Sequence, residues 1–237
     1  MSARYHILEY LGATAGSQLY RGRCRQDDAP VLLKVPYTTA ARPAQAASFQ
    51  REYDALLSPA MPGRIPPIAL VNDDGRPLMV LQDVAGGLLE SLLDRQGLDV
   101  PACLRLGSQL AQIAGALHAA HIIHRDIRPA NFMLDIQQQL RLLDLSQAAF
   151  ETQEVAVPGN DLPRDWAYVS PEQTGRMNRP LDYRSDFYSL GVMLYRMLTG
   201  QLPFAAGDPV EWTHCHIARS PSPPRSIASE IPPVVAD

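Results

Sequence analysis

The chain has 237 residues, a formal net charge of −4 and 46% hydrophobic residues. This length allows one large domain or two small lobes, and the apolar content is ordinary for a globular protein with a core. The negative charge argues against nucleic acid as the main partner, because phosphate backbones require a basic face. The three cysteines, Cys24, Cys103 and Cys215, are odd in number and far apart, so neither a disulfide framework nor a zinc site is expected.

The first ten residues, MSARYHILEY, lack the apolar core of a signal peptide, and no apolar run is long enough to cross a bilayer. We therefore expect a cytoplasmic location and no membrane partner. Among the 21 Lys+Arg residues, only Lys34 is a lysine. Because lysine is a compact point charge and arginine a planar fork, this favours a requirement for an ammonium group at position 34; the alternative is that chance left one lysine there.

Residues 1–83 are predicted to be mainly β, with one helix. β-branched and apolar runs separated by glycines predict short strands. The predicted strands are 5–11, 17–24, 31–36, 66–72 and 77–83. Over 42–57, Phe49, Tyr53 and Leu56 recur at helical spacing, which predicts a helix. The Asn-Asp-Asp-Gly segment at 72–75 predicts the turn between the last two strands.

After Gly86 and Gly87 the pattern becomes mainly helical. Predicted helices are 88–97, 101–121 and 184–199, and predicted strands are 132–134 and 140–143. Residues 145–170 have little periodicity and are predicted to be a long functional loop. The Pro- and Ser-rich tail at 220–237 is interpreted as a linker or as the approach to further structure.

The segment HRDIRPAN, residues 124–131, carries the strongest chemical pattern. It places Asp126 and Asn131 on one tight loop between a helix and a strand pair, with Pro129 stiffening the loop. An aspartate there can accept the proton of an attacking hydroxyl, while an asparagine oxygen can hold a metal ion. The alternative, an ordinary polar turn, is disfavoured by the combined match.

With these residues the sequence resembles a eukaryotic-type protein kinase, whose other motifs occur in a fixed order. In VLLKV, Lys34 lies on a strand, where the family uses lysine to hold the α- and β-phosphates of ATP. Glu52, on the next helix, is placed as its ion-pair partner; a solvated helix glutamate is the alternative. In LLDLSQA, Asp144 matches the magnesium-binding aspartate of the Asp-Phe-Gly motif, with Leu145 and Ser146 replacing Phe and Gly.

The resemblance implies an ATP site with a modified glycine-rich loop. Gly12 takes the first glycine position, whereas Thr14 and Ser17 take the second and third, so their hydroxyls could donate to phosphates. An ordinary hairpin is the alternative for this segment. Adenine would pair with backbone groups of the hinge that follows Leu81. The expected ATP-binding residues are Gly12, Thr14, Ser17, Leu19, Lys34, Leu81, Gln82 and Val84.

Further motifs follow the family pattern with departures. Arg128 stands where serine/threonine kinases usually have a lysine close to the γ-phosphate. Arg164 and Asp165 stand where a Gly-Thr pair usually contacts the substrate hydroxyl site. Residues 170–172, SPE, resemble the Ala-Pro-Glu that closes the activation segment. Asp186 matches the aspartate that begins the large central helix and hydrogen-bonds to the catalytic loop.

Residues 168–204 are the most family-specific part of the chain. They are similar to the N-terminal kinase domains of large bacterial multi-sensor proteins, which also carry an ATPase module, a GAF domain and a histidine kinase. The resemblance implies further signalling domains as partners. It also implies two or three helices beyond Asp237, one of which would supply an arginine to pair with Glu172.

The sequence therefore predicts an α+β, two-lobed protein kinase-like fold, with a mainly β lobe at 1–83 and an incomplete, mainly α lobe at 84–237. We expect transfer of the γ-phosphate of Mg-ATP, bound in the cleft, to a Ser or Thr hydroxyl of a protein substrate. The expected catalytic residues are Asp126, Arg128, Lys34 and Glu52, and the expected Mg²⁺ ligands are Asn131 and Asp144.

Two other functions are considered. A pseudokinase that binds nucleotide or partners as a scaffold is favoured by the altered glycine loop, the residues after Asp144, the substitution at Asp165 and the expected absence of the last helices. Retention of Lys34, Asp126, Asn131 and Asp144 together counts against it. A small-molecule phosphotransferase of related fold would lack the segment around SPE. The pair His214 and His216 predicts no metal site, because residues two apart point to different sides of a helix; it is interpreted as ordinary helix surface.

Overall fold

The computed structural model describes residues 4–236, except positions 15, 38–42, 59–60, 74, 96 and 151–164. The chain divides into two compact units. The first unit comprises Met1–Leu89 and Ala130–Ser146, and the second comprises Glu90–Pro129 and Gln147–Asp237. The boundary between residues 83 and 84 that the sequence suggested stays a prediction. Within the described ranges, no helix has the length and apolar character needed to cross a membrane.

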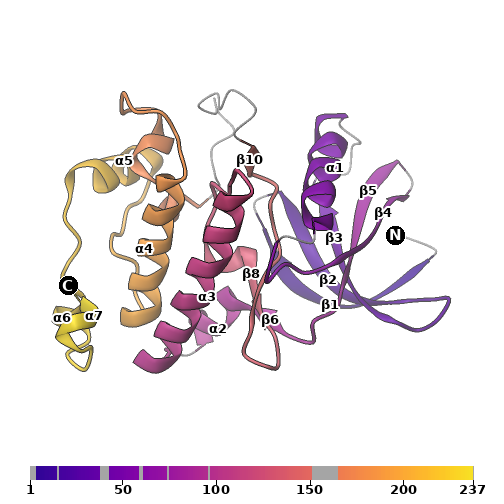
Figure 1. Ribbon diagram of the computed structural model, residues 1–237, viewed down its shortest axis with the longest axis horizontal. Coiled ribbons are helices and arrows are strands. Elements are labelled where there is room, and N and C mark those ends of the chain that lie inside the picture. The colour runs from indigo at the N-terminus through magenta and orange to yellow at the C-terminus, as the bar shows by residue number, and fades with distance from the viewer. Residues whose placement is uncertain are drawn as a thin grey trace. The chain divides into compact units, whose positions relative to one another are not determined.

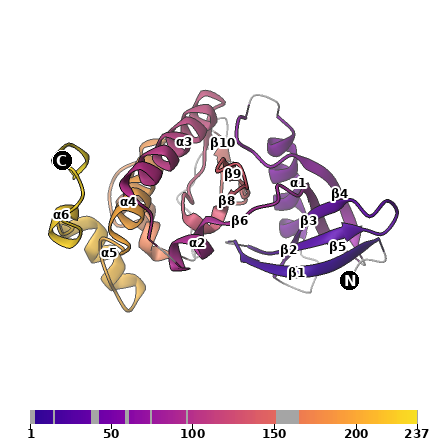
Figure 2. The same ribbon diagram turned by 90° about the horizontal axis from the view of Figure 1, so that it is seen from below.

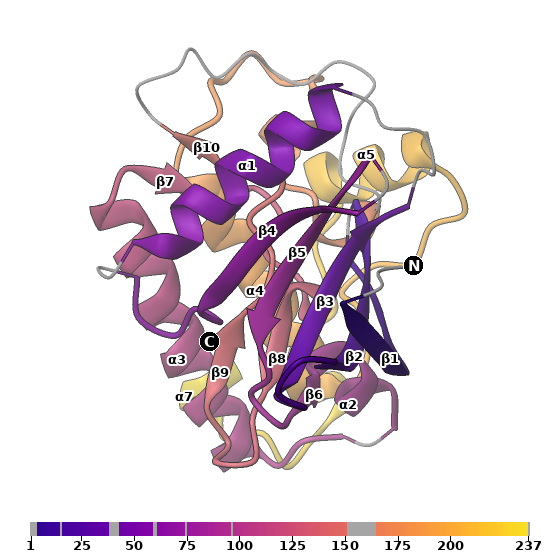
Figure 3. The same cartoon turned by 90° about the vertical axis from the view of Figure 1, so that its right-hand side faces the viewer.

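A five-stranded antiparallel sheet forms the main body of the first unit, in the order β1-β2-β3-β5-β4 (Figure 1). The strands are β1 Tyr5–Ala13, β2 Ser17–Cys24, β3 Pro30–Pro36, β4 Pro67–Asp73 and β5 Arg76–Gln82. Each lies within two residues of a predicted strand at either end. The helix α1, Pro43–Leu57, packs against β4 and β5 and crosses them on one side of the sheet (Figure 3).

The side chains of β3 alternate between two faces of the sheet: one face packs in an apolar cluster, and the other carries Lys34. Val31 and Leu33 pack with Leu78 and Val80 of β5 in one buried apolar cluster. Because successive side chains of a strand point to opposite faces, Lys34 lies on the other face, where it is fully buried. The position of the lysine therefore follows from the strand period.

A second, smaller sheet of the first unit holds the segment that follows the catalytic loop. It contains β6 Gly87–Leu88, β8 Phe132–Leu134 and β9 Leu140–Leu142 in the order β6-β8-β9. The strands β8 and β9 were predicted, whereas β6 was not, and the predicted helix 88–97 is α2, Leu89–Arg95. A two-residue strand is too short to carry a period, which explains the error.

Two long helices form the main body of the second unit. These are α3, Val100–Ala119, and α4, Arg184–Thr199, and they pack side by side (Figure 2). The Asp99 side chain caps α3 by accepting a hydrogen bond from Ala102 N at 2.7 Å. α4 ends at Gly200, whose φ of +72° is the left-handed conformation common after a helix.

The remaining elements of the second unit are short. They are β7 Ile122–Ile123, β10 Ala149–Phe150, α5 Pro209–Ala218, α6 Pro224–Ile227 and α7 Pro233–Ala236, with 3₁₀ turns η2 Trp166–Tyr168 and η3 Pro171–Thr174. The prediction of a loop throughout 145–170 is wrong at β10 and η2, while 151–164 lie outside the described residues. The tail, expected to be a linker or an approach to structure, contains α6 and α7. An antiparallel sheet with one helix and a mainly helical part confirm the predicted α+β, kinase-like fold.

Gly86 is a position of close backbone packing in the first unit. A Cβ atom there would lie 2.2 Å from the backbone oxygen of Leu134 and 2.8 Å from Asp135 Cα. We expect Gly86→Ala to lower the free energy of unfolding by about 1–3 kcal/mol, because backbone must move to admit the methyl group. Urea unfolding measures this.

The matched control is Gly87→Ala, since a Cβ at Gly87 would meet nothing within 4 Å. Its effect should stay below about 1 kcal/mol. Equal effects of the two substitutions would contradict the close packing at Gly86.

Candidate active site

The first unit contains a buried cluster of three charged side chains. Lys34 Nζ donates to Glu52 Oε1 at 2.5 Å and to Asp144 Oδ2 at 2.6 Å, and all three side chains are at most 1% exposed. Glu52 Oε1 also accepts a hydrogen bond from Leu145 N at 2.8 Å. The cluster joins β3 and α1, which follow one another in the sequence, to the segment after β9, where Asp144 lies 110 positions after Lys34.

The neighbouring charges in this cluster raise the pKa of Lys34 and lower the pKa of Asp144. Burial alone would lower the pKa of Lys34, but the carboxylates of Asp144 and Glu52 raise it above its ordinary value. Burial would raise the pKa of Asp144, yet Lys34 and the Ser146 hydroxyl hold it well below its usual range. The Lys34 ammonium and the Asp144 carboxylate are therefore both charged at neutral pH.

Glu52 behaves differently, because burial raises its pKa to about 7 and outweighs the attraction of Lys34. The geometry agrees: Glu52 Oε2 is buried and accepts no hydrogen bond from the described residues. A buried carboxyl oxygen without a donor is the natural place for a proton. Lys34 nevertheless contacts both carboxyl groups, at 2.5 Å for Glu52 Oε1 and 2.6 Å for Asp144 Oδ2.

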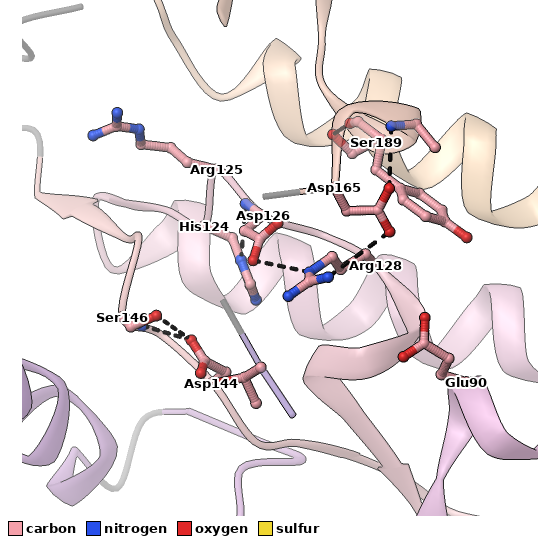
Figure 4. Close-up of polar contacts among 12 residues, drawn as sticks. Glu90, His124, Arg125, Asp126, Arg128, Asp144, Ser146, Asp165 and Ser189 are labelled. Atoms are coloured by element: carbon pink, nitrogen blue, oxygen red, sulfur yellow. Dashed lines mark hydrogen bonds and ion pairs between the residues drawn. The ribbon is translucent and has the colours of Figure 1, made fainter. Parts of the chain in front are cut away.

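Asp144 and Asn131, the expected Mg²⁺ ligands, flank the paired strands β8 and β9: Asn131 precedes β8, and Asp144 follows β9. Leu143 N donates to the backbone oxygen of Asn131 at 3.0 Å, which places Asn131 next to the strand that precedes Asp144. Ser146 donates to Asp144 Oδ1 through both its backbone N, at 2.8 Å, and its hydroxyl, at 2.6 Å (Figure 4). An ionised carboxylate and an amide oxygen suit Mg²⁺, which prefers oxygen ligands, so these residues fit a magnesium–nucleotide.

Two hydroxyl groups of the glycine-rich loop, those of Thr14 and Ser17, lie within hydrogen-bonding distance of each other. The Thr14 and Ser17 hydroxyls are 2.8 Å apart and buried, and a hydrogen bond from Thr14 also lowers the pKa of Asp144. Gly12 has a φ of +144°, and a Cβ there would lie 2.5 Å from Leu88 Cδ1. Only glycine is tolerated at such a position. The hydroxyls expected to meet phosphates thus bond within the protein here.

The other residues expected to bind ATP also lie in the first unit. Leu19 and Leu81 are fully buried on β2 and β5. Gln82 N donates to Pro66 O at 3.0 Å. Gln82 and Val84 line a cavity of about 340 Å³. Their contact with adenine stays a prediction.

Asp186 organises the catalytic loop within the second unit. Its Oδ1 accepts a hydrogen bond from Arg125 N at 2.8 Å, and its Oδ2 accepts one from His124 N at 2.9 Å. His118 Nε2 lies 2.8 Å from the same Oδ2. These bonds support Arg125 at a φ of +66°, a conformation that costs energy for a residue with a side chain. The carboxylate thereby fixes the backbone immediately before Asp126.

Asp126 and Arg128 lie together in the second unit, and Arg128 also contacts Asp165. Arg128 Nε donates to Asp126 Oδ2 at 3.2 Å, and Arg128 Nη1 is 3.8 Å from Asp165 Oδ2. The proposed base, Asp126, is thus flanked by a fixed cation. Such an arrangement can accept a proton from a hydroxyl and hold a transferring phosphoryl group nearby.

Several functional contacts were missed from the sequence. Gln173 Nε2 donates to Arg125 O at 2.7 Å and supports the catalytic loop from η3. Ser185 donates to Glu172, the residue expected to pair with an arginine beyond Asp237. The two pairs are 48 and 13 positions apart, and such separations leave no local pattern, so neither contact could be predicted from the sequence.

The prediction that the pair His214 and His216 is ordinary surface is wrong for His216. His216 is buried, stacks on Trp212 and has its ring nitrogens 2.7 Å from Tyr188 Oη and 2.7 Å from Trp166 O. Burial lowers the pKa of His216. Both nitrogens are engaged by protein atoms, so the residue packs α5 against η2. The described residues contain no group of three or more His, Cys, Asp or Glu side chains that could hold a metal.

Asp186→Asn tests the support of the catalytic loop. The amide can accept only one of the two backbone hydrogen bonds well, so one buried N–H loses its partner. We expect the free energy of unfolding to fall by about 2–3 kcal/mol, measured by urea unfolding. As a control, Asp182→Asn changes a partly exposed carboxylate that pairs with the exposed Arg184, and it should cost less than about 1 kcal/mol. Similar losses in both variants would refute this role of Asp186.

The raised pKa of Glu52 predicts a pH-dependent stability. The carboxyl titrates at 4.5 in the unfolded chain and at about 7 in the folded one, so the folded state binds more protons between these values. This contribution to stability is present at low pH and is lost as the pH rises toward 7. Unfolding free energies at pH 5.5 and 7.5 should therefore show wild type gaining on Glu52→Gln at the lower pH. A difference between the two proteins that does not change with pH would contradict the raised pKa.

The sequence comparisons agree with this geometry. A model of the protein kinase domain matches residues 5–230. A probable serine/threonine-protein kinase, CPE1738, of Clostridium perfringens is 28% identical over 231 residues, which cover 97% of this chain and 33% of that protein. Serine/threonine-protein kinase PknB of Mycobacterium tuberculosis is 32% identical over 245 residues, covering 94% and 37%.

Serine/threonine-protein kinase pkn3 of Myxococcus xanthus is 30% identical over 234 residues, which cover 93% of this chain and 42% of that protein. The chain thus spans 33% to 42% of the length of these three relatives. Together with the matching fold and loop geometry, the match over almost the whole chain identifies it as a member of the protein kinase domain family.

Proposed function

We propose that the chain transfers the γ-phosphate of Mg-ATP to a Ser or Thr hydroxyl of a protein. The observation that carries this proposal is the fully buried Lys34 ammonium held between Glu52 and Asp144. Burying an ionic cluster costs more desolvation energy than its ion pairs return in most cases. Charged clusters of this kind with perturbed pKa values are concentrated at functional sites.

In this proposal the site residues of the first unit bind the phosphates and the metal ion or orient the residues that do so. Lys34 holds the α- and β-phosphates, and Glu52 orients Lys34 from α1. Asp144 and Asn131 hold Mg²⁺, which, when bound, neutralises the charge that develops on the phosphate oxygens. Ser146 fixes the Asp144 carboxylate with two hydrogen bonds.

The residues of the second unit handle the acceptor. Asp126 accepts the proton of the Ser or Thr hydroxyl at its carboxylate as the oxygen attacks the γ-phosphorus in line. Arg128 places a permanent positive charge beside that carboxylate, near the transferred phosphoryl group. Named serine/threonine kinases among the relatives support Ser or Thr as the acceptor.

The pseudokinase alternative is less well supported. The replacement of the motif glycine by Ser146 was a reason to suspect lost activity. However, the Ser146 hydroxyl donates to Asp144 Oδ1 at 2.6 Å, a hydrogen bond that glycine could not make, so the substitution adds to the orientation of this carboxylate. We further propose that the kinase acts in the bacterial cytoplasm, in signalling, as one part of a longer protein with additional domains.

Asp126→Asn tests the proposed chemistry. The substitution preserves shape but removes the proton acceptor, so transfer of labelled γ-phosphate to itself or to a generic Ser/Thr protein should fall by about 100-fold or more. Binding of Mg-ATP, measured by calorimetry, should be retained.

Asp28→Asn is the control, because Asp28 is an exposed partner of Arg23 at a left-handed φ of +57° that asparagine accepts readily. It should leave transfer unchanged. A folded wild-type protein that binds Mg-ATP but transfers no label to any acceptor would reject the proposal in favour of a pseudokinase scaffold.

A further inference from the structure

The Arg128 guanidinium lies between two aspartates of the second unit. Its Nε donates to Asp126 Oδ2 at 3.2 Å, and its Nη1 lies 3.8 Å from Asp165 Oδ2. Figure 4 shows the guanidinium between the two carboxylates, with Asp126 on one side and Asp165 on the other. The guanidinium therefore contacts one aspartate through Nε and the other through Nη1.

Burial makes these contacts matter. The side chain of Arg128 is 9% exposed and that of Asp126 is 2% exposed, whereas Asp165 is 29% exposed. A buried arginine that lost a counter-charge would face a large desolvation cost. Asp165 therefore supplies a further negative charge to a cation that Asp126 contacts directly and that Glu90 also attracts.

Asp165 is itself held in place by the turn it begins. Its Oδ1 accepts a hydrogen bond from Ala167 N at 3.2 Å and caps η2, while Oδ2 faces Arg128. The η2 turn is itself bound to α4, because the Ser189 hydroxyl donates a hydrogen bond to Tyr168 O at 2.7 Å. The two oxygens of Asp165 thus have different tasks, and the one facing Arg128 has a fixed position.

Both positions depart from the usual kinase sequence, and the structure links the two departures. A lysine at 128 would place one point charge near Asp126, whereas the arginine fork presents Nε and Nη1 in different directions. Arginine can therefore contact Asp126 and Asp165 at once. A threonine at 165 would offer a neutral hydroxyl and no counter-charge for the second nitrogen.

We propose that Asp165 is a positioning residue that holds the Arg128 guanidinium against Asp126, so that Arg128 and Asp165 act as one matched pair in phosphoryl transfer. The proposal rests on the proposed function for its effect on the rate. It predicts that changing either residue alone slows phosphoryl transfer, and that changing the second residue as well causes little further loss. Replacing either member frees the guanidinium or its substitute to move away from Asp126.

The test compares the wild type with Asp165→Asn, Arg128→Lys and the double variant. Asparagine can still cap η2 through its oxygen, so Asp165→Asn removes charge but keeps the turn. Each single substitution should lower kcat about 5- to 10-fold, with the KM for ATP changed less than about 2-fold. The double variant should be no slower than the slower single variant, since residues in one network are not additive.

The control is Asp94→Asn, which removes a different aspartate–arginine pair of the second unit, that of Asp94 with Arg196 at 2.5 Å. It should leave kcat unchanged. An unchanged kcat in Asp165→Asn, or single effects that multiply in the double variant, would overturn the matched pair.

Failure of the proposed function has a different signature. A wild type that transfers no phosphate would reject the kinase activity, and the pairing is then read from melting temperatures of the same four proteins. A matched pair requires that the double variant melt no lower than the less stable single variant. Melting-temperature losses that add would overturn the pairing even in an inactive protein.

Discussion

The buried ion cluster around Lys34 is the interaction on which the first unit depends. It links the strand β3, the helix α1 and the segment after β9 through one ammonium group. β3 and α1 follow one another in the chain, whereas Asp144 lies 110 positions after Lys34, so side-chain contacts join the segment after β9 to the other two elements at this point. Because a buried charge without its partner is strongly unfavourable, each of the three elements needs the other two in place. The same residues that constrain the fold are those that would handle phosphate charge.

The second unit uses the same principle with a single carboxylate. Asp186 sits at the start of α4 and accepts hydrogen bonds from two successive backbone N–H groups of the catalytic loop. One of these belongs to Arg125, whose positive φ is unfavourable outside such support. Gln173 Nε2 donates a hydrogen bond to the carbonyl oxygen of the same Arg125. The loop geometry before Asp126 is therefore imposed by helices and turns that lie about 50 to 60 residues later in the sequence.

The long elements are predicted from the sequence because they have strong local signals, and the Lys34–Glu52 pair is predicted from the order of the family motifs. The contact of Lys34 with Asp144 was not predicted, since Asp144 was expected only as a magnesium ligand. The strand period places Lys34 on the face opposite Leu33, and motif order links it to Glu52. Short strands such as β6 escape prediction, since two residues show no period. The burial of His216 also escapes, because its partners Tyr188 and Trp166 come from other elements. The departures at 128 and 165 are visible in the sequence, but their contact is not, because 37 positions separate them.

The way the chain departs from the usual kinase motifs bears on whether it is catalytic. A domain that has lost its chemistry is free to accumulate buried polar groups with poor partners, which cost stability but no activity. Here, two polar substitutions among the described residues have partners of suitable chemistry: the Ser146 hydroxyl donates to Asp144, and Arg128 meets Asp126 and Asp165. Satisfied buried polar groups are expected wherever position is selected for. The changes are therefore better understood as a rebuilt phosphotransfer site than as the decay of one, and the matched pair is where that difference has its sharpest consequence.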